Sequence, residues 1–148
     1  MRDRLEECDA FVRAVLWGVF LLAAVPKIQD PAAFAKIVNN YKLVPGLGVN
    51  AVALYLPWLE LVAAFSLILP LGRPLRVAGM LLVALMLMAF VGAQVWAWSK
   101  GIDTACGCFS VSIEGKSAGL WGAVGNGVLL AGVVFSLAVS SSDTSVRD

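Results

Sequence analysis

The sequence predicts an all-α protein: a polytopic membrane bundle of four helices, with a short amphipathic interfacial helix between the first and second. Hydrophobic residues make up 60% of the 148 residues and charged residues only 14%, whereas a soluble domain averages about half and a quarter. Mean hydropathy is +0.87. The apolar residues also gather in long runs. A chain of this composition cannot cover itself with polar surface in water, so we expect one membrane domain over residues 1–148.

Charge and histidine content exclude several classes of function. The net charge is +1 and there is no long basic run, so the chain lacks the electrostatic footprint of a nucleic-acid-binding protein. Histidine is absent, which excludes histidine-held haem, the usual catalytic zinc sites and Ser-His or Cys-His pairs. Two thiolates could hold a soft ion such as Cu(I), but a complete ligand set is hard to build here, and we predict no metal site.

The first predicted span covers residues 11–27. Arg13 can extend to the near membrane surface and Lys27 to the far one. A signal peptide is the alternative for so short an apolar stretch, but the flanking segment is acidic rather than simply basic, so we reject it.

An amphipathic helix is expected next. Asp30 is a good N-cap and Pro31 suits the first helical position. The apolar residues of this helix follow at i, i+3, i+4 and i+7, and its polar residues occupy the other side: Phe34, Ile37, Val38 and Tyr41 against Lys36, Asn39, Asn40 and Lys42. This pattern is typical of a helix lying in the membrane interface, with a packed extramembrane lid as the alternative.

Three further spans complete the predicted bundle. Residues 48–71 contain Glu60 as their only charged residue, and Pro57 predicts a kink. Residues 76–98 are uncharged after Arg76 and end with Trp96 and Trp98 as an aromatic belt. Residues 118–139 carry small residues four apart, which we interpret as a packing stripe. A polar loop at 100–117 separates the last two spans.

The predicted topology places both termini in the cytoplasm. Four spans put six arginines on one side and five lysines on the other: Arg2, Arg4, Arg13, Arg73, Arg76 and Arg147 against Lys27, Lys36, Lys42, Lys100 and Lys116. The count is nearly balanced, but the tight turn with two arginines favours the first side as cytoplasmic. The 100–117 loop then faces outward, which in a bacterium is the periplasm.

Cys106 and Cys108 are the main candidates for chemistry. A disulfide between them would close a small, strained ring that is easily reduced, and Gly107 supplies the backbone freedom for it. In an oxidising compartment the pair could cycle between dithiol and disulfide. The alternative is a structural disulfide or two inert thiols.

Glu60 and Lys27 are the charged candidates inside the spans. A carboxylate in mid-span is costly and usually faces the bundle interior or a watery cavity. Glu60 could be protonated, paired with Lys27 or hydrogen-bonded to Asn126. It could handle protons beside a redox reaction or clamp two helices together. Tyr41 and Trp58 are candidates for lining a cofactor pocket.

One cysteine pair cannot pass electrons across a membrane through thiols alone, because the loop lacks a second pair. It must exchange with a separate partner. The electrons then come from or go to a membrane carrier such as a quinone, or pass between extracellular partners.

Several local patterns together resemble the MauE (methylamine utilisation) family, within the wider DoxX-like group. They run from Lys27 and the Asp30-Pro31 cap, through Asn40-Tyr41 and Leu56-Pro57-Trp58-Leu59-Glu60-Leu61, to Cys106-Gly107-Cys108-Phe109. The resemblance implies a four-helix protein of the bacterial inner membrane that works with a periplasmic thioredoxin-like partner. It also implies a part in forming or transferring disulfides during maturation of enzymes such as methylamine dehydrogenase. Carried over by position, the conspicuous residues are Lys27, Tyr41, Glu60, Cys106 and Cys108.

We therefore expect a component of a thiol–disulfide oxidoreductase system, with Cys106 and Cys108 as the exchanging pair and Glu60 and Lys27 tuning protonation. The alternative is a non-catalytic assembly or docking subunit whose loop disulfide only shapes a binding surface.

Overall fold

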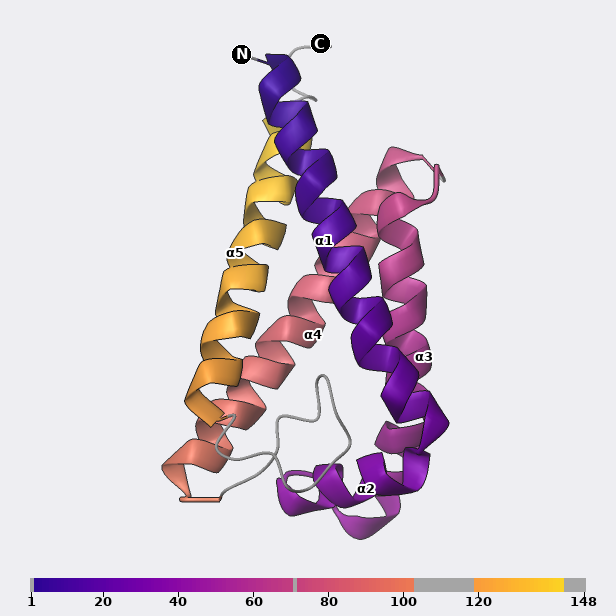
Figure 1. Ribbon diagram of the computed structural model, residues 1–148, viewed down its shortest axis with the longest axis vertical. Helices are drawn as coiled ribbons and strands as arrows, with labels where there is room; N and C mark the ends of the chain where they lie inside the picture. Colours follow the sequence, from indigo (N-terminus) through magenta and orange to yellow (C-terminus); the bar gives the residue numbers. More distant parts are fainter. Residues whose placement is uncertain (1, 71, 103–118, 143–148) are drawn as a thin grey trace.

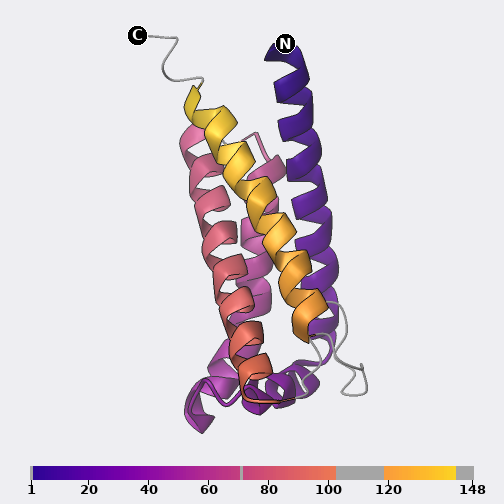
Figure 2. The same ribbon diagram turned by 90° about the vertical axis from the view of Figure 1, so that its left-hand side faces the viewer.

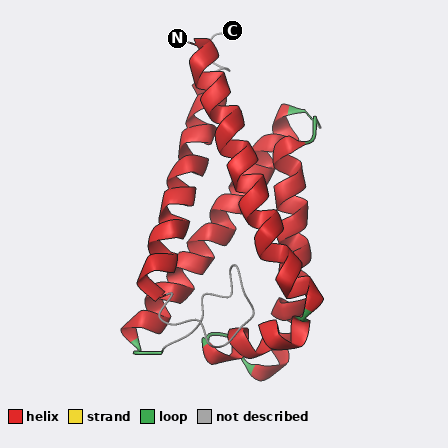
Figure 3. Cartoon of the chain, viewed as in Figure 1, coloured by secondary structure: helices red, strands yellow, loops and turns green. Residues whose placement is uncertain are grey.

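The computed structural model of the protein describes residues 2–70, 72–102 and 119–142. Within these ranges the chain forms helices and short connections and no strand: α1 (Arg2–Gln29), α2 (Pro31–Asn40), α3 (Gly46–Ile68), α4 (Arg73–Ser99) and α5 (Gly119–Ser142) (Figure 3). α1, α3, α4 and α5 are each long and apolar enough to cross a membrane. The predicted all-α membrane bundle is therefore confirmed.

The four long helices close into a bundle. α1 packs on α3, α3 on α4, α4 on α5, and α5 returns to α1 (Figures 1 and 2). The short helix α2 lies across one end, which we call the α2 end (Figure 1). Both chain termini lie at the other end, the terminal end. α1 therefore runs toward the α2 end, and α4 finishes there, where α5 begins.

The short helix α2 forms where the sequence predicts an amphipathic segment. The backbone N–H of Ala33 donates to the Asp30 carboxylate at 2.9 Å, and Pro31 occupies the first turn. Phe34 and Ile37 are buried and pack with Ala53 of α3. The opposite side of α2 is exposed. The cap fixes where α2 starts, and its apolar face holds it against the bundle.

Polar contacts tie the terminal end together. α1 extends beyond the predicted 11–27 span toward the N-terminus. Arg13 Nε lies 2.9 Å from Asp9 Oδ2, one turn earlier, as an ion pair. The Ser136 hydroxyl of α5 donates to Asp9 Oδ1, and Arg73 of α4 donates to the Ser140 carbonyl. These contacts link α1 and α4 to α5 at this end.

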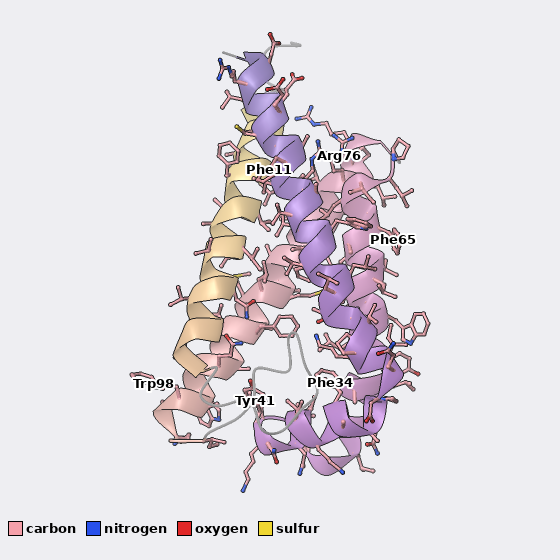
Figure 4. All side chains as sticks on the ribbon, in the orientation of Figure 1. Phe11, Phe34, Tyr41, Phe65, Arg76 and Trp98 are labelled. Atoms are coloured by element: carbon pink, nitrogen blue, oxygen red, sulfur yellow. The ribbon has the colours of Figure 1, made fainter. Side chains whose placement is uncertain are left out.

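The core is apolar and the outer surface is apolar as well. The core comprises large and small side chains from all four long helices: Leu16, Phe20, Ala63, Ala64, Leu67, Met80, Val83, Met86, Leu87 and Val133. Outside, Phe11 of α1 is 70% exposed and Trp98 of α4 is 64% exposed, and both point away from the bundle (Figure 4). An outer surface of this kind suits contact with lipid chains rather than with water.

The contact between α3 and α4 depends on a glycine. A Cβ added at Gly79 would lie 2.8 Å from Ser66 Cβ. The Ser66 hydroxyl donates to the Ala63 carbonyl one turn earlier, so it is satisfied within its own helix. In lipid, small residues at such points let two helices approach closely.

We expect Gly79→Ala to destabilise the protein by about 1–3 kcal/mol, because the added methyl group must push α3 and α4 apart. Gly92→Ala is the matched control, since nothing lies within 4 Å of a Cβ at that position of the same helix. It should be neutral or stabilising by up to about 1 kcal/mol. Unfolding in detergent measures both, and Ser66→Gly should rescue Gly79→Ala. Equal effects of the two glycine substitutions would contradict this account of the packing.

Candidate functional site

Lys27 of α1 and Glu60 of α3 form a buried ion pair. Lys27 Nζ lies 2.5 Å from Glu60 Oε1. The side chain of Lys27 is 2% exposed and that of Glu60 is 1% exposed. The sequence left three alternatives open for Glu60: protonation, an ion pair with Lys27 or a hydrogen bond to Asn126. In the structure Glu60 forms the ion pair with Lys27. Two charges so fully removed from water are held only where the surrounding structure compensates them.

The helices position the two charges for different reasons. Lys27 lies in the last turn of α1, where the carbonyl end of the helix dipole favours a cation. Glu60 lies on the inward face of α3, one turn after Pro57 and one turn before Ala64, which are both buried. The small side chains on this face allow α1 to pack closely on α3. The charges therefore meet inside the bundle, and Lys27 does not reach the surface.

Two aromatic rings complete the surroundings of the lysine. Its Nζ lies 5.2 Å from the centre of the Phe34 ring of α2 and 5.4 Å from that of the Phe90 ring of α4. Both distances allow cation–π attraction, which is stronger away from water. The ammonium group is thus held by one carboxylate and two rings, contributed by three different helices. We call Lys27, Glu60, Phe34 and Phe90 the charge cluster.

The second carboxylate oxygen of the charge cluster, Glu60 Oε2, has no hydrogen-bond partner among the described residues. Glu60 Oε2 is buried and accepts no hydrogen bond within the described part of the chain. The group borders a small pocket whose other walls come from α1, α4 and α5: Val19, Phe20, Ala23, Lys27, Leu87, Phe90, Asn126 and Leu129. Except for Lys27, Glu60 and Asn126, these walls are apolar. Leaving a buried acceptor without a hydrogen bond costs free energy. A hydrogen-bond donor placed in the pocket would therefore stabilise the Glu60 carboxylate.

A pair of buried amides lies beside this pocket. Asn126 of α5 donates to the Gln94 side-chain oxygen of α4 at 3.3 Å, and both residues are buried. The sequence offered Asn126 as a possible hydrogen-bond partner of Glu60. In the structure Asn126 lines the same pocket as Glu60, and its side chain donates to Gln94 of α4. Gln94 was not identified from the sequence, although a lone amide within an uncharged span is a signal of a buried polar contact.

The remaining predicted residues lie in different places. Tyr41 is partly buried and packs against the cluster of Phe34, Ile37 and Ala53 at the α2 end (Figure 4). Trp58 is 55% exposed on α3 and is not among the residues that line the pocket. Cys106 and Cys108 lie outside the described residues.

Comparison with known proteins gives a consistent result. A family model described as methylamine utilisation protein MauE matches residues 6–139. The chain is 37% identical over 128 residues to the methylamine utilization protein MauE of Methylorubrum extorquens, a match that covers 86% of this chain and 67% of that protein. It is 39% identical over 93 residues to the protein of the same name from Methylophilus methylotrophus, covering 61% of this chain and 46% of that one. No solved structure matches the chain.

The burial of the ion pair generates a prediction about stability. Lys27→Met should destabilise the protein by about 3–5 kcal/mol, because Glu60 then remains buried without its counter-ion. Glu60→Leu should destabilise the protein by a similar amount, because Lys27 then remains buried without its counter-ion. The double variant should recover most of the loss, since two apolar side chains of similar volume replace the pair.

Unfolding in detergent or lipid measures this cycle, with Lys36→Met on the exposed side of α2 as the matched control, expected within about 0.5 kcal/mol of the parent. If Lys27→Met were as mild as Lys36→Met, or if the two single losses simply added, the charges could not be a buried pair.

Proposed function

Since this chain belongs to the MauE family, we propose that it is a bacterial inner-membrane thiol–disulfide redox protein that serves methylamine utilisation. In this proposal Cys106 and Cys108 exchange electrons with a periplasmic thioredoxin-fold partner. The exchange supports the formation of disulfides in periplasmic enzymes or the maturation of these enzymes. The chain would then act as one component of a thiol–disulfide oxidoreductase system. Because the matched region covers 67% or less of each curated relative named above, the activity of the longer proteins is part of the proposal.

The proposed exchange proceeds in two balanced steps. A thiolate of the partner attacks the Cys106–Cys108 disulfide and forms a mixed disulfide, which the partner's second thiol resolves. The partner then holds the disulfide, and Cys106 and Cys108 are reduced to thiols. To work again, the two thiols must lose two electrons and two protons to an acceptor, and we propose that this acceptor is a membrane quinone.

The observation that carries the proposal is Glu60 Oε2 in the charge cluster, which has no hydrogen-bond partner in the part of the chain that the structure describes. Thiol oxidation releases protons, and a buried carboxylate oxygen without a hydrogen-bond donor is a group that can accept one. Lys27 Nζ donates a hydrogen bond to the other oxygen, Glu60 Oε1. When Glu60 gives its proton up again, the lysine ammonium stabilises the carboxylate that is left. α4 ends and α5 begins at the α2 end, where Lys27 also lies, and Cys106 and Cys108 fall between these two helices in the sequence.

The proposed orientation places the terminal end in the cytoplasm and the α2 end at the periplasmic face. Arg73 and Arg76 lie at the terminal end of α4. Because the total counts of lysine and arginine on the two sides are nearly balanced, these two arginines at the tight turn are the support for this orientation. A thioredoxin-fold partner in the periplasm would then meet the end of the bundle at which α4 finishes and α5 begins.

Thiol trapping in cells tests the exchange. Cys106→Ser and Cys108→Ser should each change the reactivity of the remaining cysteine, and one of them should accumulate a mixed disulfide with a second protein, because the resolving thiol is missing. Cys8→Ser is the matched control, since Cys8 is an exposed thiol near the opposite end of the bundle. It should leave the trapping pattern unchanged.

If Cys106 and Cys108 stay fully oxidised under every growth condition and neither serine variant forms a mixed disulfide, exchange is untenable. The non-catalytic docking subunit would then be the better account of the chain.

A further inference from the structure

The pocket beside Glu60 has the size and the polar walls of a site for a single water molecule. We infer that it binds one ordered water, which accepts a hydrogen bond from Lys27 Nζ, donates one to Glu60 Oε2 and carries protons to and from that carboxylate. The transfer of protons rests on the proposed function, in which the thiols release them. The binding of the water rests on the described helices alone.

The volume of the pocket matches one water. The space open to a water-sized molecule is about 20 Å³, and a buried cavity needs roughly 10–15 Å³ to hold a water. The pocket therefore accommodates about one water molecule and is too small for an organic ligand.

Glu60 supplies the acceptor that such a water satisfies. Its side chain is 1% exposed, and its Oε2 has no hydrogen-bond partner in the described helices and connections. An ionised carboxylate oxygen accepts hydrogen bonds and cannot donate them. A water molecule carries two donor hydrogens, so one O–H directed to Oε2 removes the cost of leaving that oxygen buried without a hydrogen bond.

Two further polar side chains border the same space. The Lys27 ammonium carries three donor hydrogens, of which one is directed to Glu60 Oε1, and Lys27 lines the pocket. Asn126 lines it from α5, and an amide oxygen has two lone pairs, so it can accept from a water in addition to its other contacts. Buried waters typically make about three hydrogen bonds. The three polar walls provide that number.

The other walls of the pocket determine how the water is oriented. They are all apolar and come from α1, α4 and α5: Val19, Phe20, Ala23, Leu87, Phe90 and Leu129. A water among such side chains finds hydrogen-bond partners only on the polar side of the pocket. Its oxygen therefore faces the Lys27 ammonium, and one of its hydrogens faces Glu60 Oε2.

This orientation allows a balanced proton transfer. The water oxygen accepts a proton released by thiol oxidation, and the water passes one of its own hydrogens to Glu60 Oε2. The water is neutral before and after the step, and the net change is one proton added to the carboxylate. The reverse transfer releases the proton, and the Lys27 ammonium then stabilises the carboxylate that is left.

Radiolytic hydroxyl-radical footprinting of the full chain in lipid nanodiscs tests the binding of the water. The radicals form from water, so a buried side chain is oxidised quickly only where an ordered water lies beside it. Leu87 and Leu67 form a matched pair, since they are 1% and 0% exposed and only Leu87 lines the pocket. Leu87 should be oxidised at least about fivefold faster than Leu67 if the pocket holds an ordered water. Equal rates would overturn the inference.

Filling the pocket provides a second test of the binding. Ala23→Val adds two methyl groups to a wall of the pocket and should lower the oxidation rate of Leu87 to that of Leu67. Ala14→Val is the matched control, because it makes the same substitution at an exposed position of the same helix, and it should leave the rate unchanged. Oxidation of Leu87 that stays fast in Ala23→Val would contradict the water site. The comparison of the two leucines in the parent protein needs no variant, so it decides the question even if Ala23→Val does not fold.

The transfer of protons is tested by the rate at which Cys106 and Cys108 reoxidise in cells after a pulse of reductant, followed by thiol trapping. Loss of the water in Ala23→Val should slow reoxidation at least about tenfold, because Glu60 then lacks its partner for proton exchange. Ala14→Val should reoxidise like the parent. Reoxidation at the parent rate in an Ala23→Val protein that has lost the fast oxidation of Leu87 would show that the water carries no protons.

The water site and the proposed exchange can fail separately. Fast oxidation of Leu87 should persist in the Cys106→Ser/Cys108→Ser double variant, because the pocket belongs to the helices. Fast oxidation together with failed thiol trapping would overturn the proposed exchange alone. Successful trapping with equal oxidation of Leu87 and Leu67 would overturn the water site alone.

Discussion

The buried ion pair between Lys27 and Glu60 is the constraint on which the rest of this bundle depends. A charged side chain inside a membrane costs at least about 2.5–3.5 kcal/mol on insertion scales, and here two such side chains are no more than 2% exposed. Their mutual attraction requires α1 and α3 to pack closely, which the small residues on the inward face of α3 permit. α2 and α4 contribute to the same group, because each places an aromatic ring near the lysine ammonium. One ionic contact thus unites the first four helices.

The two ends of the bundle differ in chemistry. The terminal end is held by polar contacts within and between helices, such as those of Asp9 with Arg13 and Ser136. The α2 end contains the charge cluster, in which one carboxylate oxygen has no hydrogen-bond partner from residues 2–70, 72–102 and 119–142 and belongs to a residue that borders a pocket. A structural clamp would be expected to satisfy both oxygens of its carboxylate. Arg13 Nε, Trp17 Nε1 and Arg76 Nε are also buried without a hydrogen-bond partner in the described part of the chain. Glu60 Oε2 differs from them because Glu60 borders the pocket.

Sequence patterns predicted the fold class because membrane helices leave strong signals. Long apolar runs predicted the four long helices, and Asp30 followed by Pro31 predicted the start of α2. The same patterns singled out Lys27 and Glu60, since charges inside apolar runs are rare, but they could not decide between a lysine that extends to the surface and one that turns inward. That choice depends on how α1 packs against α3 in space. Phe90 and Gln94 escaped prediction because an aromatic residue or a lone amide in a span resembles ordinary core until its neighbours on other helices are known.

The central claim is that Glu60 responds to the redox state of the cysteine pair, and infrared difference spectroscopy of the protein in lipid tests it most directly. Spectra of the dithiol and disulfide forms are subtracted, and the carboxyl and carboxylate bands are followed. The account predicts a carboxyl band that changes on thiol oxidation, is lost in Glu60→Gln and is retained in the Cys8→Ser control. A difference spectrum with no carboxyl change, or with one that persists in Glu60→Gln, would contradict the account.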